Sequence, residues 1–99
     1  MKVISPGQII KLWLVYQENG INITGLTDLT VTAKDQNENI VLSQPLTEIG
    51  STGEYIYNWN TASISLENTI RVYYKKGEIA LTTEEYYVDV VEDQDGMII

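Results

Sequence analysis

The chain contains no cysteine and no histidine, and these two absences exclude several classes of function. Without cysteine there is no disulfide, no thiolate metal site and no cysteine nucleophile. Without histidine there is no Ser–His or Cys–His couple, no imidazole ligand for zinc, and no ordinary general base poised near neutral pH. We therefore expect a protein that is not an enzyme, with no catalytic residue, no cofactor and no metal site.

Positive charge is also scarce, since 6 basic residues stand against 14 acidic ones and the net charge is −8. Such a chain repels phosphate backbones, so we expect no binding to nucleic acid. No apolar run approaches the roughly 20 residues of a membrane span, which predicts a soluble protein. Pro6, Gly7 and Lys11 interrupt the N-terminal stretch before the core of a secretion signal could form, so no such signal is expected.

The length of 99 residues is typical of one domain with one hydrophobic core. A chain of this size can bury enough surface to fold without disulfides or a structural metal. We expect a sandwich domain over residues 6–92, an N-terminal arm or edge strand over residues 1–5, and a C-terminal tail over residues 93–99.

Apolar residues recur with a period of two in most segments, which is typical of strands with one face turned toward a core. The most informative case follows a Gly-rich turn, where Tyr55, Tyr57 and Trp59 alternate with smaller or polar residues. The Asn19-Gly20 pair is the strongest signal for a tight turn. The segments expected to form strands are 9–17, 28–34, 40–44, 54–59, 69–75, 79–83 and 84–92.

These segments predict an all-β protein, because none shows the 3.6-residue period of a helix over three turns. Residues 9–17 carry apolar groups on both faces and are expected to form a central strand. The alternation over residues 28–34, in contrast, predicts a strand with one face in the core and one wet, solvent-facing side. About seven short strands without a cystine match an immunoglobulin-like antiparallel β-sandwich with no disulfide.

Five short motifs follow one another along the chain. They are a Pro-Gly entry, a Leu-Thr-Val-Thr-Ala strand, an Asp-Gln-Asn turn, a Thr-Glu-Ile-Gly stretch and a Gly-Glu-Tyr-Ile-Tyr-Asn-Trp strand at 6–7, 29–33, 35–37, 47–50 and 53–59. This order resembles small immunoglobulin-like modules that recur in virion proteins of tailed bacteriophages, and the resemblance covers roughly residues 6 to 91. It implies a virion structural protein, made in the host cytoplasm, that serves in capsid decoration or as a neck, tail or baseplate accessory subunit, with no catalytic residues.

The polar segment 35–39 permits two interpretations. Asp35, Asn37 and Asn39 match the first three ligand positions of a calcium loop, but position six is Ile40 instead of Gly and position twelve is Leu46 instead of Glu. We favour a hairpin turn here, with weak calcium binding as the alternative.

The nine aromatic residues divide by the face on which they fall. Trp13, Tyr73 and Tyr87 lie opposite the better apolar stripes, so they are candidates for an exposed patch that binds a protein partner. The same rings could stack on sugars, which makes a carbohydrate- or cell-surface-binding module the alternative function. Five of the other six rings are expected in the core or at its rim, namely Tyr55, Tyr57, Trp59, Tyr74 and Tyr86.

The tail is the segment that a self-contained sandwich explains least, because a polar stretch leads to Met97, Ile98 and Ile99. Such an apolar segment can dock on its own sandwich, add to a neighbouring subunit, or remain disordered. We favour docking on a partner. The leading hypothesis is therefore a homo-oligomer or part of a larger assembly, formed with copies of itself or with other virion proteins.

The tail hypothesis yields the first prediction. Removal of residues 93–99 should spare folding, because the expected strands end by Glu92, but it should weaken association. The measurement is the light-scattering mass of the intact and shortened chains at matched concentration. An unfolded shortened chain, seen by circular dichroism, would contradict the prediction.

Overall fold

The structure is a computed structural model that describes residues 2–89, and within these residues it consists of strands and turns with no helix. The prediction of an all-β protein is therefore confirmed. The strands are β1 (Lys2–Ile4), β2 (Ile9–Val15), β3 (Gln17–Glu18), β4 (Ile21–Asn22), β5 (Leu29–Lys34), β6 (Ile40–Pro45), β7 (Thr47–Glu48), β8 (Glu54–Asn60), β9 (Asn68–Lys76) and β10 (Ile79–Val88).

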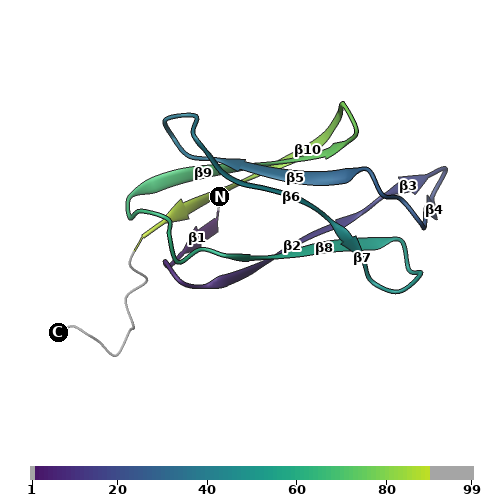
Figure 1. The fold of residues 1–99 in the computed structure, drawn as a ribbon, viewed down its shortest axis with the longest axis horizontal. Helices are drawn as coiled ribbons and strands as arrows, with labels where there is room; N and C mark the ends of the chain where they lie inside the picture. Colours follow the sequence, from purple (N-terminus) through teal and green to yellow (C-terminus); the bar gives the residue numbers. More distant parts are fainter. Residues whose placement is uncertain (1, 90–99) are drawn as a thin grey trace.

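Two sheets pack face to face as a sandwich (Figure 1). One has five strands in the order β1-β10-β9-β5-β6, and the other has three in the order β2-β8-β7. All pairs are antiparallel except β1 with β10, which run parallel. The chain moves repeatedly from one sheet to the other, as in immunoglobulin-like sandwiches, so the predicted fold class is confirmed.

The inward faces of both sheets form one core. In β5 every second residue is buried, which confirms that this strand has one wet face. Of the aromatic stripe on β8, Tyr55 and Trp59 are buried and Tyr57 is half-buried. The Trp59 ring meets the Tyr86 ring of the opposite sheet edge-on, with centroids 6.2 Å apart. This geometry suits the ring quadrupoles and ties the two sheets together.

The prediction of a central strand over residues 9–17 is wrong. Within residues 2–89, β2 lies at the edge of the three-stranded sheet and pairs only with β8. The apolar residues on its second face, Ile9 and Trp13, are exposed to solvent, with 56% and 48% of their surfaces accessible. An apolar pattern on two faces therefore does not distinguish a buried central strand from an edge strand with exposed apolar residues.

The separation of residues 79–83 from 84–92 is also wrong, because Ile79–Val88 form one continuous strand. The pairing of β10 with β9 shifts register between Ala80 and Thr82. Such an irregularity interrupts the alternation of inward and outward side chains, and the sequence pattern therefore looks like two separate strands. Residues 90–92 lie outside the described residues.

Two glycine positions depend on left-handed backbone. Asn19 and Gly20 have φ of 53° and 77°, as a two-residue hairpin of type I′ requires, and they join β3 to β4. Gly53 has φ of 79°, and a Cβ built on it would lie 2.6 Å from the Asn22 Cβ. The Asn22 amide also donates to the Thr52 carbonyl at 3.1 Å, so this hairpin rests closely on the 50–53 turn.

This contact yields the second prediction. Gly53→Ala should reduce the free energy of unfolding by about 3 kcal/mol, because it combines left-handed strain with a steric clash. Gly50→Ala is the matched control, since Gly50 has φ of 58° but open space around its Cα, and it should cost only about 1 kcal/mol. The measurement is urea unfolding, and equal losses would contradict the prediction.

Candidate functional site

The structure does not bring the predicted partner-binding residues together. Trp13 lies on the outer face of the three-stranded sheet, whereas Tyr73 and Tyr87 lie on the outer face of the five-stranded sheet, where both are half-buried. Two separate surfaces must therefore be considered. The other predicted residues, Met97, Ile98 and Ile99, lie outside the described residues.

Trp13 is held in place by its polar atom while its ring stays half exposed. The indole Nε1–H donates to Glu54 Oε1 at 3.0 Å, and Glu54 lies on the neighbouring strand β8. Ile56 is the residue directly opposite Trp13 in the register. Ile9 and Val15 follow the same face of β2, and the exposed Lys11 lies between Ile9 and Trp13. We call Ile9, Trp13, Val15 and Ile56 the Trp13 face.

The edge of β2 is open. Within residues 2–89, β8 pairs with one side of this strand and no strand pairs with the other. The nearest strand of the opposite sheet, β1, pairs with Tyr86–Val88 of β10 instead. An unpaired edge presents backbone amide and carbonyl groups that can accept another strand.

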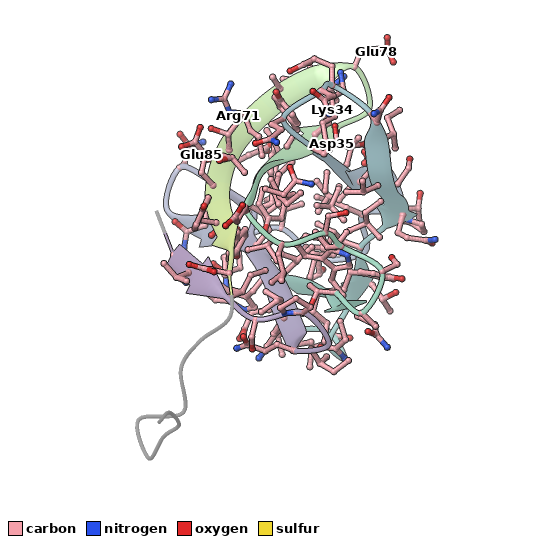
Figure 2. The ribbon with its side chains drawn as sticks, turned by 90° about the vertical axis from the view of Figure 1, so that its left-hand side faces the viewer. Lys34, Asp35, Arg71, Glu78 and Glu85 are labelled. Atoms are coloured by element: carbon pink, nitrogen blue, oxygen red, sulfur yellow. The ribbon has the colours of Figure 1, made fainter. Side chains whose placement is uncertain are left out.

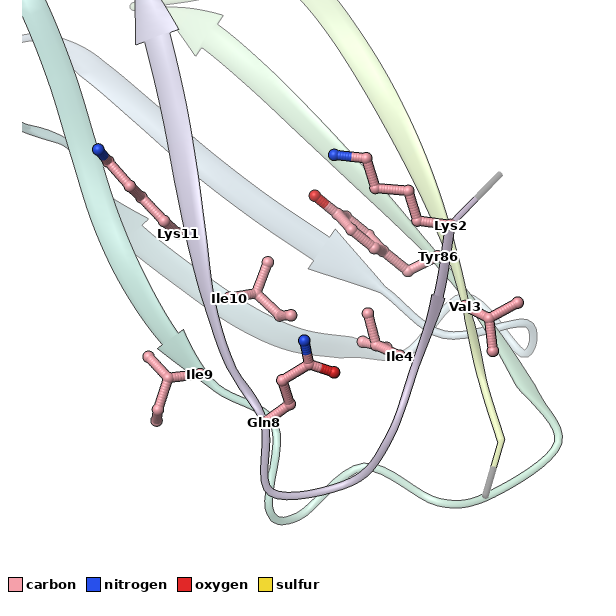
Figure 3. A pocket seen from close by; sticks show the side chains of 8 residues that line it. All are labelled: Lys2, Val3, Ile4, Gln8, Ile9, Ile10, Lys11 and Tyr86. Atoms are coloured by element: carbon pink, nitrogen blue, oxygen red, sulfur yellow. The ribbon is translucent and has the colours of Figure 1, made fainter. Parts of the chain in front are cut away.

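A groove runs between β1 and the start of β2, and its volume is about 530 Å³. Ile4 and Ile10 provide its apolar floor, because both are buried in the core. In Figure 3 Ile4, Ile10 and Tyr86 point into the gap between the two strands, whereas Lys2 and Lys11 lie on opposite sides of it. The groove is therefore apolar at its base and flanked by positive charge.

Glu84 lies beyond the groove along β10 and points toward the interior of the sandwich. Its Oε1 accepts hydrogen bonds from the Tyr74 hydroxyl at 2.8 Å and from the Tyr86 hydroxyl at 3.2 Å. β1 does not extend over this part of β10. A carboxylate turned inward on an uncovered edge disfavours random strand addition there, so the positively flanked groove is the better place for an added segment.

The hydroxyl groups of Tyr74 and Tyr86, which both donate to Glu84, have raised pKa values. Burial raises the pKa of Tyr86 to about 12, and the neighbouring Glu84 charge and its hydrogen bond contribute in the same direction. Burial likewise raises the pKa of Tyr74, again with contributions from Glu84. Both hydroxyls are therefore fixed hydrogen-bond donors at neutral pH and are not poised for proton transfer.

The sequence pair Glu84-Glu85 does not form two convergent carboxylates. Glu84 points into the sandwich, whereas Glu85 is on the outer face, where it forms an ion pair with Arg71. Figure 2 shows Arg71 and Glu85 side by side on this face. Adjacent residues of a strand project to opposite faces, which is why the two groups separate.

The outer face of the five-stranded sheet forms the second surface. The Lys34 ammonium lies 5.7 Å from the centroid of the Tyr73 ring, within cation–π range. A shallow hollow of about 270 Å³ is lined by Thr32, Lys34, Tyr73 and Lys75. This face is therefore polar and locally cationic, in contrast to the Trp13 face.

The segment 35–39 forms the turn of the β5–β6 hairpin, which confirms the favoured interpretation of this segment. Asp35 Oδ1 accepts the backbone amides of Asn37 and Asn39, both at 2.9 Å. The Asn39 backbone hydrogen bond, with the Asn37 one, holds the pKa of Asp35 below its ordinary value. Within residues 2–89, no group of three or more acidic side chains is arranged to hold a metal ion.

The groove is the part of the site that the sequence did not reveal. It requires β1 to pair in parallel with the end of β10, more than 80 positions further along the chain. Lys2, Gln8 and Lys11 carry no motif, and nothing in their local pattern identifies them as neighbours. Tyr86 was expected at the core or its rim, and it is buried while also lining the groove.

Comparisons of the chain with family models, with curated proteins and with solved structures find no match. Over the part of the chain that the structure describes, there is no helix long and apolar enough to cross a membrane.

The tyrosine hydroxyls at Glu84 yield the third prediction. In the unfolded chain Tyr86 ionises near its ordinary pKa of 10.0, whereas the folded state retains the proton up to about pH 12. The free energy of unfolding should therefore fall between pH 10 and pH 12, because ionisation then favours the unfolded state. Tyr86→Phe should make this fall shallower, as measured by urea unfolding at several pH values. Equal slopes for the two proteins would contradict the assignment.

Proposed function

We propose that the chain is a non-enzymatic structural or interaction protein that acts by protein–protein binding. The observation that carries the proposal is the combination of two features on one strand. β2 has an open backbone edge within residues 2–89, and it also presents exposed apolar side chains on its outer face. Edge strands are normally protected, so an edge that is open and apolar is typical of a surface covered by a partner.

The Trp13 face has the chemistry of an interface centre. Tryptophan is enriched among the residues that dominate binding energy, because it buries a large ring without losing many rotamers. The Glu54 hydrogen bond satisfies the indole N–H and fixes the ring orientation before a partner arrives. Ile56 extends the apolar surface across to β8, whereas Lys11 separates Ile9 from Trp13 along β2. Binding here would therefore require little reorganisation.

The proposed setting is a phage virion, in which the chain would be an accessory subunit of the capsid, neck or tail. The support is the resemblance of residues 6 to 91 to immunoglobulin-like virion modules, together with a sandwich fold that offers an edge for assembly. The partners would be copies of the same chain or other virion proteins, and assembly would follow synthesis in the host cytoplasm.

A carbohydrate-binding module is the second candidate, and the hollow beside Tyr73 is the observation that favours it. Thr32, Lys34 and Lys75 surround one face of the hollow with hydroxyl and ammonium groups. An aromatic ring among such donors suits a sugar, and the two ammonium groups favour one that carries a negative charge. Trp13 lies on the opposite sheet, so the two candidate functions use different surfaces.

The leading proposal yields the fourth prediction. Trp13→Ala should weaken self-association by roughly 30-fold, equivalent to about 2 kcal/mol, because a central tryptophan is removed from the interface. Its effect on folding should be small, since the ring is half exposed. The measurement is the association constant from sedimentation equilibrium.

Tyr73→Ala is the matched control, because it removes an aromatic ring from the outer face of the other sheet. Association should be unchanged in this variant. If Tyr73→Ala weakens binding to acidic sugars while Trp13→Ala leaves self-association intact, the carbohydrate function replaces the leading proposal.

A further inference from the structure

We infer that the groove between β1 and β2 receives residues 90–99 of a second copy of this chain. The inference rests on the proposed function of self-assembly and adds the identity of the two contacting surfaces. The receptor is the groove with Ile4 and Ile10 at its base and Lys2 and Lys11 at its sides. The ligand is the segment Val-Val-Glu-Asp-Gln-Asp-Gly-Met-Ile-Ile.

Charge complementarity is the first argument. Residues 90–99 contain Glu92, Asp93 and Asp95 and no basic residue, in a chain that has only six basic residues. Two of those six flank the groove. A negatively charged segment is therefore attracted to this part of an otherwise acidic molecule.

Apolar complementarity is the second argument. Met97, Ile98 and Ile99 follow the acidic residues. The exposed side chains of Val3 and Ile9 line the groove and offer apolar surface, whereas Ile4 and Ile10 at its base are almost wholly covered. The open edge of β2 can add backbone hydrogen bonds to an extended segment, with alternate side chains entering the groove. Glu84 lies beyond the groove, where its carboxylate repels the acidic part of the segment. The acidic residues are therefore expected to lie between the two lysines and not beside Glu84.

Chain length permits a second copy as the source. Asp89 is already beside the groove, because its amide donates to the Ile4 carbonyl at 3.0 Å. Ten residues beyond it span up to roughly 33 Å when extended, which exceeds the 20 Å shortest extent of the molecule. The segment is therefore long enough to reach the groove of a neighbouring copy.

The test is the binding of a fluorescent synthetic peptide of residues 90–99 to the full chain, followed by fluorescence polarisation. The host carries Met97→Asp and Ile98→Asp so that its own segment does not compete. We expect saturable binding that weakens as salt is added, because the lysine contacts are exposed to solvent.

The double variant Lys2→Glu/Lys11→Glu in the same host should weaken peptide binding at least tenfold, because two exposed attractions become repulsions. A peptide with Glu92, Asp93 and Asp95 replaced by lysine should recover affinity for this variant. The matched control, Lys34→Glu/Lys75→Glu, makes the same change in net charge on the outer face of the five-stranded sheet and should reduce binding less than threefold.

A complementation experiment distinguishes a second copy from the same chain. The chain with Lys2→Glu/Lys11→Glu has an intact segment, and the chain with Met97→Asp/Ile98→Asp has an intact groove. Each alone should have a lower light-scattering mass than the original protein, and mixing them should restore a mixed complex. If the original protein assembles but the peptide does not bind, or if mixing restores nothing, the inference is wrong while self-assembly stands. A single-chain mass for the original protein at every concentration would contradict self-assembly itself.

Discussion

The structure depends on one constraint, which is that a five-stranded sheet and a three-stranded sheet share a single core. The smaller sheet must supply large side chains to cover the larger one. β8 does so with Tyr55 and Trp59, which cross between the layers, and Trp59 meets Tyr86 edge-on. The Tyr55 hydroxyl also donates to the Ile23 carbonyl at 2.7 Å, so the same ring anchors the loop before β5. The narrower sheet then leaves β2 without a second neighbour within residues 2–89.

The two faces of β2 differ in role, because one packs in the core and the other carries the proposed contact surface. Leu12 is fully buried and belongs to the core, whereas Trp13, the next residue, is half exposed and bonded to Glu54. A substitution on the inward face would thus affect folding, and one on the outward face would affect the contacts that we propose with other molecules. Glu84 disfavours random pairing on the uncovered part of β10, so the edge of β2, beside the groove flanked by Lys2 and Lys11, is the better of these two places for an added strand.

The sequence predicted well which side chains of a strand face the core, but it predicted poorly which strands lie next to one another. The period of two placed Val31 and Ala33 inside and identified the wet face of β5, because alternation is a local property. The Asn19-Gly20 turn was found for the same reason, since left-handed backbone favours these two residues. Edge positions, the parallel pairing of β1 and the groove depend on contacts far apart in sequence. Trp13 was correctly placed opposite the apolar stripe, but its separation from Tyr73 depends on the assignment of their strands to different sheets.

In the proposed assembly, a second molecule covers the open edge of β2. Amide hydrogen exchange of the intact chain, measured at low and high protein concentration, tests this claim most directly because it reports on individual strands. We expect protection of residues 9–15 to rise with concentration, while protection of the internally paired β5 stays constant. If protection of β2 does not change with concentration, no second molecule of this chain covers its edge.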